Sequence, residues 1–436
     1  MHKTKIRKFI TAVSLSVLLT GCAGNTAVDM EAVQTDLTAI AIPEQVQVVA
    51  LGEASHGVKE YQELKAEIFR ALVRNCGCRT FIIEGDFGNA LKVDAYIHGG
   101  KGTAKEAAAA IGFRIYRTKE MADLLEWMRA YNETAPAGKD LHFYGMDMQQ
   151  ADNSKDYLFG ILEQVDPELA AEYEESLAFL NDDAIYDLGT DAFAEGMPTA
   201  GKLLAEVDQA EASIVQTCGS EAFAFARECA VSIRNCCDIR KSNSEYNEVR
   251  DSHMAEKVHW FLEHGDGSLL FINGHNGHIA RTNTSLYECL GKRLAEDLGE
   301  GYFAIGTDAR ITTFNSQTDN GFKEITVKNK NDMNTLAGSV EGARYYIDFA
   351  KAASFNGWDA LLTGTHRITS LNVGSITLLK MFYTTKIVPN ETFDGMIVFE
   401  KVGPTTLEAA ESASVSSPGQ NGHDSHISSD VTLPVC

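Results

Sequence analysis

Short apolar runs alternate with amphipathic stretches along most of the chain. The apolar runs predict buried strands at residues 46–51, 80–83, 141–144, 269–272, 302–305, 345–347 and 396–399. Between the first three runs, residues 58–74 and 121–131 place apolar side chains at helical spacing. Strands that are apolar almost throughout and alternate with helices are typical of parallel sheets covered on both faces. The pattern therefore predicts an α/β fold with a largely parallel central sheet flanked by helices.

The middle and the ends of the chain depart from this pattern. Residues 152–264 have helical periodicity and no convincing strand, which predicts a large helical insertion or cap. Residues 22–34 are expected to form a short tether, and residues 404–436 are rich in Ser, Thr and Gly with little apolar content. Such a tail buries too little surface to offset its ordering entropy, so we expect disorder there. The catalytic body is expected over residues 35–403.

The first 21 residues have the pattern of an export signal. Lys3, Lys5, Arg7 and Lys8 precede an apolar run at residues 9–19, which is too short for an ordinary membrane span of about 20 residues. The run ends in the sequence LTGC, which resembles a bacterial lipobox with Cys22 as the lipidated residue. We therefore expect an exported protein, anchored by lipid at Cys22 to the bacterial cell membrane without spanning it.

Composition narrows the classes of partner. The 436 residues are 44% hydrophobic, which is enough for a large core and excludes a disordered chain. The formal net charge is −23, and a protein this acidic repels phosphate backbones. No nucleic-acid partner is expected. The remaining eight cysteines do not match zinc-finger spacing, and their redox state stays open.

Titratable residues collect at the ends of the predicted strands. Glu53 and His56 follow the first strand, Glu84 follows the second, and His275 and His278 follow the fourth. Asp147 follows the third strand. In parallel sheets, ligands bind beyond the carboxyl ends of the strands. Each residue alone has a structural explanation, but together they predict a catalytic site at that edge. Five other histidines are expected to be packing or surface residues: His98, His142, His253, His259 and His264.

A buried lysine supports the same site. On the helix predicted at 58–74, Lys65 points into the apolar stripe, where an unpaired charge is costly. This helix begins beside the loop of Glu53 and His56, so a carboxylate at the sheet end is its natural partner. The alternative is an internal ion pair with a purely structural role.

Three segments together resemble the signature of the erythromycin esterase family. They are LGEASHG at 51–57, the glutamate within FIIEG at 81–85, and NGHNGH at 273–278, and weaker matches extend the resemblance over roughly residues 35–400. The resemblance implies hydrolysis of a macrolide lactone by a histidine-activated water.

In that family, the catalytic histidine of the first motif corresponds to His56, and the supporting acids correspond to Glu53 and Glu84. The second histidine motif corresponds to His275 and His278. Many relatives carry Arg or Lys at the position of Lys65.

Two departures concern the substrate. Relatives usually have an aromatic residue and Ala before the second histidine motif, where this chain has Asn273 and Gly274. Residues 152–240 show no match that would identify a substrate. The reaction class is therefore better supported than the macrolide-like small molecule expected as partner.

Residue chemistry favours hydrolysis without a covalent intermediate. The sequence has no G-x-S-x-G motif, so the usual serine nucleophile of α/β hydrolases is absent. His56 can take a proton from water while Glu53 or Glu84 orients its ring, and His275, His278 and Lys65 can stabilise the oxyanion. Ser55 as a nucleophile is the less favoured alternative, because adjacent Ser and His side chains rarely face each other.

Two other functions stay open. Three histidines and several carboxylates could hold a catalytic Zn²⁺, although the H-x-x-x-H spacing is missing. We expect no cofactor, with a divalent metal acting on another ester or amide as the alternative. The last alternative is a surface lipoprotein that binds a ligand without catalysis. Pure binding sites seldom concentrate buried titratable groups, which argues against it.

Overall fold

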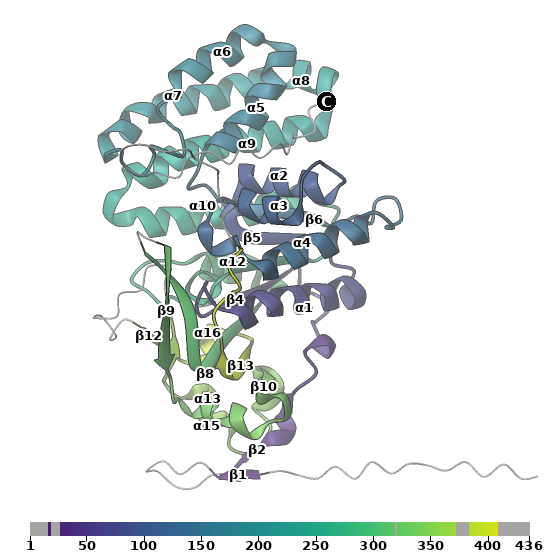
Figure 1. Cartoon of the computed structure of the whole chain (residues 1–436), viewed down its shortest axis with the longest axis vertical. Coiled ribbons are helices and arrows are strands. Elements are labelled where there is room, and N and C mark those ends of the chain that lie inside the picture. Colours follow the sequence, from purple (N-terminus) through teal and green to yellow (C-terminus); the bar gives the residue numbers. More distant parts are fainter. Residues whose placement is uncertain (1–15, 19–26, 319–320, 372–382, 409–436) are drawn as a thin grey trace, which may run out of the picture.

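The computed structural model describes residues 16–18, 27–318, 321–371 and 383–408, and it is built around a nine-stranded sheet (Figure 1). The sheet order is β3-β10-β13-β8-β4-β7-β5-β6, with β9 paired to β8. Its strands are β3 (Val33–Gln34), β4 (Val48–Glu53), β5 (Thr80–Asp86), β6 (His142–Asp147), β7 (Leu270–His275), β8 (Tyr302–Thr318), β9 (Gly321–Lys328), β10 (Arg344–Asp348) and β13 (Gly395–Val402). The seven predicted strands are confirmed.

The six strands from β13 to β6 pair in parallel, and β3, β9 and β10 join as antiparallel strands. The predicted largely parallel sheet is therefore confirmed. Two small antiparallel pairs lie outside it. They are β1 (Ser16–Leu18) with β2 (Ala27–Asp29), and β11 (His366–Thr369) with β12 (Thr384–Ile387).

The central strands are largely apolar before their polar carboxyl ends because both of their faces are covered. Along β4, Val49 and Leu51 enter one hydrophobic core, while Val48 and Ala50 enter the other. The alternation of side chains along a strand thus divides one apolar run between two cores.

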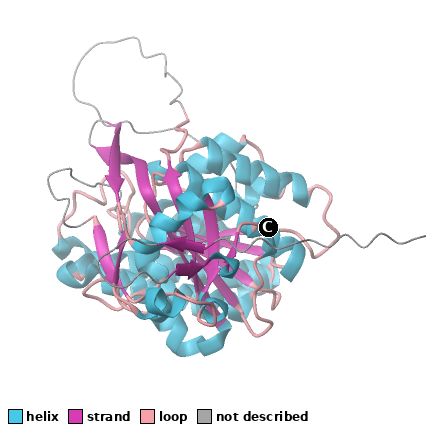
Figure 2. Cartoon of the chain, turned by 90° about the horizontal axis from the view of Figure 1, so that it is seen from below, coloured by secondary structure: helices cyan, strands magenta, loops and turns pink. Residues whose placement is uncertain are grey.

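Helices cover both faces of the sheet, as the view from below shows (Figure 2). Apart from the layer of helices at residues 152–241, the longer helices are α1 (Lys59–Cys76), α2 (Phe87–Ile97), α3 (Ala104–Ala110), α4 (Lys119–Asn132), α10 (Tyr246–His264) and α12 (Leu290–Leu298). Short helices complete the set: α11 (Asn276–Ile279), α13 (Asp332–Leu336), α14 (Phe349–Ala352), α15 (Trp358–Thr363) and α16 (Pro389–Thr392). The apolar sides of α1 and α4 share one core, and α10 and α12 contribute to the other.

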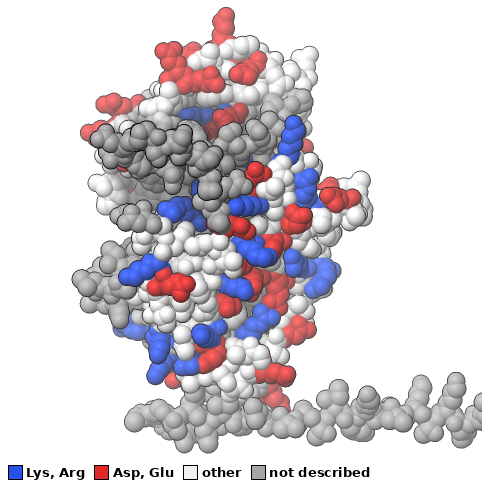
Figure 3. All heavy atoms as spheres, viewed as in Figure 1, with Lys and Arg blue, Asp and Glu red and all other residues white. Residues whose placement is uncertain are grey.

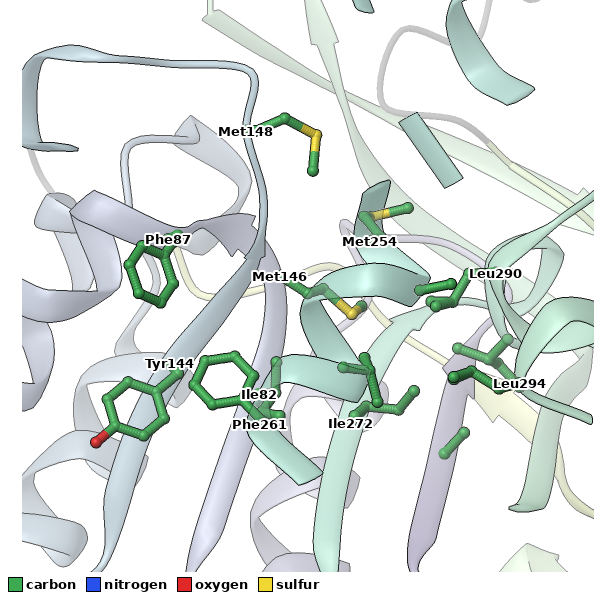
Figure 4. Close-up of a cluster of buried hydrophobic side chains, with 14 of the residues drawn as sticks. Ile82, Phe87, Tyr144, Met146, Met148, Met254, Phe261, Ile272, Leu290 and Leu294 are labelled. Carbon is green, nitrogen blue, oxygen red and sulfur yellow. The ribbon is translucent and has the colours of Figure 1, made fainter. Parts of the chain in front are cut away.

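The second core joins the sheet to the helices above it. Figure 4 shows Ile82, Tyr144 and Ile272 of the strands beside Met254 and Phe261 of α10. The Tyr144 and Phe261 rings stack with their centroids 4.9 Å apart. This core holds α10 against the sheet and fixes where its polar residues reach the strand ends.

A helical layer occupies the top of Figure 1. It consists of α5 (Asp152–Val165), α6 (Pro167–Ser176), α7 (Thr190–Gln209), α8 (Glu211–Cys218) and α9 (Ser220–Lys241). These helices and α10 account for the helical stretch expected at 152–264. In Figure 3, acidic side chains gather over the helical layer, whereas both signs of charge mix lower on that face.

The ordered body extends past both expected boundaries. Residues 33–34, expected in the tether, pair with β10, and Trp358 Nε1 donates a hydrogen bond of 2.8 Å to the Asp29 carbonyl. At the other end, the Thr405 amide donates to the Gly57 carbonyl at 3.1 Å. These short segments are packed because each finds backbone partners in the body.

The remaining expectations for the chain ends lie mostly outside the described residues. Cys22, most of the signal segment at 1–21 and residues 409–436 belong to that part, so the lipid anchor and the disordered tail stay predictions. Across the described ranges, no helix is both long and apolar enough for a membrane span. Within the described residues, six cysteines are free thiols: Cys76, Cys78, Cys229, Cys236, Cys237 and Cys289.

Candidate active site

The register of the sheet brings the strand ends together. Glu53, the last residue of β4, lies beside His275, the last residue of β7. Next to them, β5 pairs with β7 and places Glu84 one residue beyond the aligned pair of Ile83 and Asn273. One edge of the sheet therefore carries residues from three neighbouring strands.

The loop that carries His56 is fixed from several sides. The Ala54 amide donates to Thr307 Oγ1 of β8 at 3.0 Å, and the Ala54 carbonyl accepts from the Leu371 amide at 2.9 Å. Gly57 packs so closely on the Asn315 carbonyl that a Cβ would lie 2.2 Å from its oxygen. These contacts hold the loop between β4 and α1 and leave His56 only 7% exposed.

His56 is oriented by a buried ion pair. Its Nδ1 lies 2.7 Å from Glu53 Oε1, and Lys65 Nζ lies 3.3 Å from Glu53 Oε2. Burial raises the pKa of Glu53, but Lys65 and His56 outweigh it and lower the pKa below its ordinary value. Glu53 therefore stays ionised and accepts the proton of Nδ1. The other nitrogen of His56, Nε2, is left as the basic one.

Glu84 is held by a residue from the insertion. Arg250 of α10 donates to Glu84 Oε1 at 2.9 Å, and the His275 amide donates to Glu84 Oε2 at 2.8 Å. Burial raises the pKa of Glu84, yet His278, Arg250 and His56 together keep it well below its ordinary value. The Tyr116 hydroxyl donates to the Glu84 carbonyl at 2.9 Å and fixes the backbone there.

Arg250 also binds Asp147, the last residue of β6. Its Nε and Nη2 donate to the two carboxylate oxygens at 2.9 and 2.6 Å. Asp86 lies beside Asp147 in the sheet, and burial and that neighbouring carboxylate raise its pKa well above the ordinary value. One guanidinium therefore bonds two buried carboxylates, Glu84 and Asp147, and the carboxyl group of Asp86 is favoured in its protonated form.

The two histidines after β7 have different environments. His278 Nδ1 lies 2.9 Å from Asp251 Oδ2, and its Nε2 lies 3.3 Å from Glu84 Oε1. Burial lowers the pKa of His278, but Asp251 and Glu84 outweigh it and raise the pKa to about 10. His278 is therefore an imidazolium at neutral pH.

His275 is neutral instead. Burial lowers its pKa to about 3, with the neighbouring histidines acting in the same direction. Its Nδ1 accepts from the Gly277 amide at 3.1 Å, so the ring proton lies on Nε2. That buried Nε2 has no hydrogen-bond partner among the described residues, and the ring centroid lies 5.4 Å from that of His56. A buried, unused N–H beside the candidate base is available to a ligand.

The structure brings all six predicted residues together, and we call this set the strand-end cluster. Its members are Glu53, His56, Lys65, Glu84, His275 and His278. Sequence reasoning gave no role to Arg250 and Asp251, which α10 contributes, or to Gln62, which donates to the His56 carbonyl at 3.1 Å. An adjacent Arg and Asp on the buried side of a helix was the available signal for the first two.

A protein-family model covers most of this chain. Residues 73–402 match the sequence model described as erythromycin esterase. The chain belongs to the erythromycin esterase family. The matched stretch begins inside α1, so it includes Glu84, His275 and His278 but not His56.

Two curated relatives of this family member are distant. Erythromycin esterase type II of Escherichia coli is 23% identical over 315 residues, covering 65% of this chain and 72% of the relative. The putative hydrolase YbfO of Bacillus subtilis is 21% identical over 400 residues, covering 83% and 85%. Membership of the family points to a hydrolase, while such low identity leaves the substrate to be proposed.

Three solved structures share the fold. A Bacillus cereus protein is 24% identical with a TM-score of 0.74, covering 86% of this chain and 92% of its own. A succinoglycan biosynthesis protein is 22% identical with a TM-score of 0.71, covering 85% and 91%. An erythromycin esterase mutant in an open conformation is 17% identical with a TM-score of 0.61, covering 86% and 94%. At these identities the likeness concerns the fold.

The strand-end cluster is poorly suited to a metal ion. Both carboxylate oxygens of Glu84 accept bonds from Arg250 and the His275 amide, and both nitrogens of His278 contact carboxylates. Each carboxylate oxygen of Glu53 is also engaged, by His56 and by Lys65. An ion would find two imidazole nitrogens, of His56 and His275, as its uncommitted donors, fewer than the three protein ligands usual for catalytic zinc.

Proposed function

We propose that this protein hydrolyses an ester bond, with a macrolide lactone as the favoured substrate, by a water that His56 activates. The observation that carries the proposal is the chain of contacts from Lys65 through Glu53 to His56 Nδ1, at 3.3 and 2.7 Å. These contacts leave Nε2 of His56 available as a general base, and the ring of His275, whose Nε2–H has no partner among the described residues, lies beside the ring of His56. Family membership supports the same reaction class.

The reaction then needs only groups of this chain and water. His56 Nε2 takes a proton from water, and the hydroxide oxygen attacks the ester carbonyl carbon. The carbonyl electrons move to oxygen, and His275 Nε2–H donates to that oxyanion. A well-placed donor of this kind contributes about 3–4 kcal/mol in the transition state. When the C–O bond breaks, the alcohol oxygen takes the proton back from His56, which gives a carboxylic acid and an alcohol.

The charged members of the cluster set the protonation states. Glu53 stabilises the His56 imidazolium that forms during the reaction, and Lys65 keeps Glu53 ionised although both are buried. His278 and Arg250 compensate the charge of Glu84, whose Oε2 holds the backbone of His275 in place. Glu84 and His278 therefore position the oxyanion donor.

The experiment is incubation of the purified protein with erythromycin, followed by mass spectrometry. A gain of one water in the drug is the expected product, and the variant His56→Ala should give none while its circular dichroism and Tm stay near wild type. Ser55→Ala is the matched control, because it changes the neighbouring residue and the alternative nucleophile. Turnover by His56→Ala, or its loss in Ser55→Ala, would contradict the mechanism. No water gain by folded wild-type protein would remove the macrolide from the proposal.

A further inference from the structure

A second cluster of potential metal-ligand side chains lies at the amino end of β6, opposite the strand ends that carry the candidate active site. Asp94 is in the last turn of α2, His98 follows the end of that helix, and His142 is the first residue of β6. Each of the three offers a ligand atom, and these atoms all lie within 4.8 Å of one another. Because β6 runs from His142 to Asp147, this cluster lies about 16 Å along the strand from the end that carries Asp147. Figure 1 shows α2 beside β6.

The separations suit a four-coordinate ion. His98 Nδ1 lies 3.3 Å from Asp94 Oδ2, and His142 Nδ1 lies 3.5 Å from Asp94 Oδ1. Ligands about 2.0–2.1 Å from a tetrahedral Zn²⁺ are separated from one another by roughly 3.3–3.4 Å. The two imidazole rings are also neighbours, with centroids 4.9 Å apart. The contact of each histidine with Asp94 therefore already has nearly the spacing that an ion requires, and all three ligand atoms lie within 4.8 Å of one another.

The surrounding bonds orient the donors. The Phe143 amide donates to Asp94 Oδ1 at 2.9 Å and fixes the carboxylate. His98 Nδ1 also lies 2.8 Å from the Asp94 carbonyl, and the Tyr144 hydroxyl lies 3.1 Å from His142 Nδ1. An ion bound by Nδ1 of each histidine would replace these two contacts, while the Phe143 amide would keep the carboxylate in place.

Charge and access favour a cation as well. The carboxylates of Asp140 and Asp266 lie near enough to act electrostatically on His98 and His142 respectively. The side chains of His98 and His142 are 31% and 36% exposed, so an ion can enter from solvent. The strand-end cluster differs in both respects, since its histidines are buried and its carboxylates are already compensated.

We propose that Asp94, His98 and His142 form a binding site for a divalent cation of the Zn²⁺ class, separate from the active site. Two imidazoles and one carboxylate are ligands that Zn²⁺ prefers, and solvent completes the coordination. The ion joins the end of α2 to the start of the edge strand β6. It therefore stabilises this edge of the sheet and takes no part in ester hydrolysis.

The test is a calorimetric titration of chelator-treated protein with Zn²⁺. We expect one saturable site in the wild type, weakened at least tenfold in His98→Ala and in His142→Ala. Asp94→Asn should weaken it similarly while an amide oxygen still accepts from Phe143. The matched control is His259→Ala, which removes an exposed histidine bonded to Asp297. Equal affinity in the wild type and both histidine variants would overturn the proposal.

Two further arms separate other sources of binding. Exposed Cys76 is the competing thiol, and Cys76→Ser should leave the affinity unchanged. Thermal unfolding supplies an independent readout, because an ion that binds only the folded state raises Tm. Zn²⁺ should raise the Tm of the wild type and of His259→Ala but not of the double variant His98→Ala/His142→Ala. A site lost in Cys76→Ser, or an equal rise in the double variant, would contradict the assignment.

Discussion

His275 and His278 differ by three positions but have opposite protonation states at neutral pH. Burial and the neighbouring histidines lower the pKa of His275 to about 3, whereas Asp251 and Glu84 outweigh burial at His278 and raise its pKa to about 10. The pair therefore separates two tasks. The neutral ring offers an N–H to a developing oxyanion, and the charged ring compensates the buried Glu84.

Removal of the neutral ring should affect turnover more than binding. We expect His275→Ala to lower kcat about 10²–10³-fold with little change in KM, since the lost donor acts on the transition state. Steady-state kinetics on the ester substrate checks this, with circular dichroism to show that the fold is kept. An unchanged kcat would remove His275 from the mechanism.

The charged ring should make stability depend on pH. The folded pKa of His278 is about 10, above the unfolded value of about 6.5. Its stabilising contribution is therefore complete below pH 6.5 and is lost as the pH rises through 10. Urea unfolding between pH 7 and 10 should show a shallower loss of stability in His278→Gln than in the wild type. The same slope in both proteins, or an equal effect of His259→Gln, would contradict the assigned charge.

At the scale of elements, α10 adds charged residues to the site that the strand ends form. Its Arg250 lies 103 positions from Asp147 and 166 from Glu84, yet it bonds both. The helix is placed by apolar packing of Met254 and Phe261 on the sheet. The insertion therefore provides the layer of helices above the sheet and also contributes a charged residue, Arg250, to the active site.

Loss of this guanidinium should destabilise the protein strongly. Arg250→Met keeps the length of the side chain but leaves Asp147 buried without its cation and Glu84 with His278 alone, and breaking a buried pair in this way typically costs about 3–5 kcal/mol. Arg250→Lys should lose less, because the charge stays while the two-fold hydrogen bonding to Asp147 is lost. Denaturant unfolding at pH 7 measures both. A loss below about 1 kcal/mol in Arg250→Met would show that the carboxylates find other partners.

Local sequence predicted the parts of this arrangement that depend on strand ends. Glu53, Glu84 and His275 could be placed together because parallel strands bring their carboxyl ends to one edge, whatever their order in the sheet. Lys65 could be placed because its position within an apolar stripe required a buried partner. Arg250 could not, since helical periodicity shows which face of α10 is buried but not which strand that face meets. The proximity of His98 to His142 could not be predicted either, because the sequence does not show that the end of α2 lies beside the start of β6.

At the scale of the whole molecule, two clusters of titratable side chains lie at opposite ends of the sheet. The strand-end cluster is buried and internally compensated, whereas the cluster of Asp94, His98 and His142 is open to solvent at the other end of β6. The two clusters should therefore respond independently to the removal of metal.

Chelation should separate stability from turnover. After dialysis against a chelator, we expect a lower Tm that Zn²⁺ restores, and an unchanged rate of ester hydrolysis at temperatures well below unfolding. Metal analysis of the dialysed protein is the control for complete removal. A rate that falls with the metal content and recovers on its addition would support a metallohydrolase instead.

The strand order also has a consequence for how the chain folds. β4 and β5 share no ladder hydrogen bonds, because β7 lies between them and β8 closes the other side of β4. During synthesis, β4, β5 and β6 emerge long before β7, because β6 ends at Asp147 and β7 begins at Leu270. Over that interval Glu84 and Asp147 have no cation from α10, so this end of the sheet is completed only after α10 and β7 have been made. Contacts this distant in sequence slow folding, because a long loop must close before β4 and β5 gain β7 as their shared neighbour.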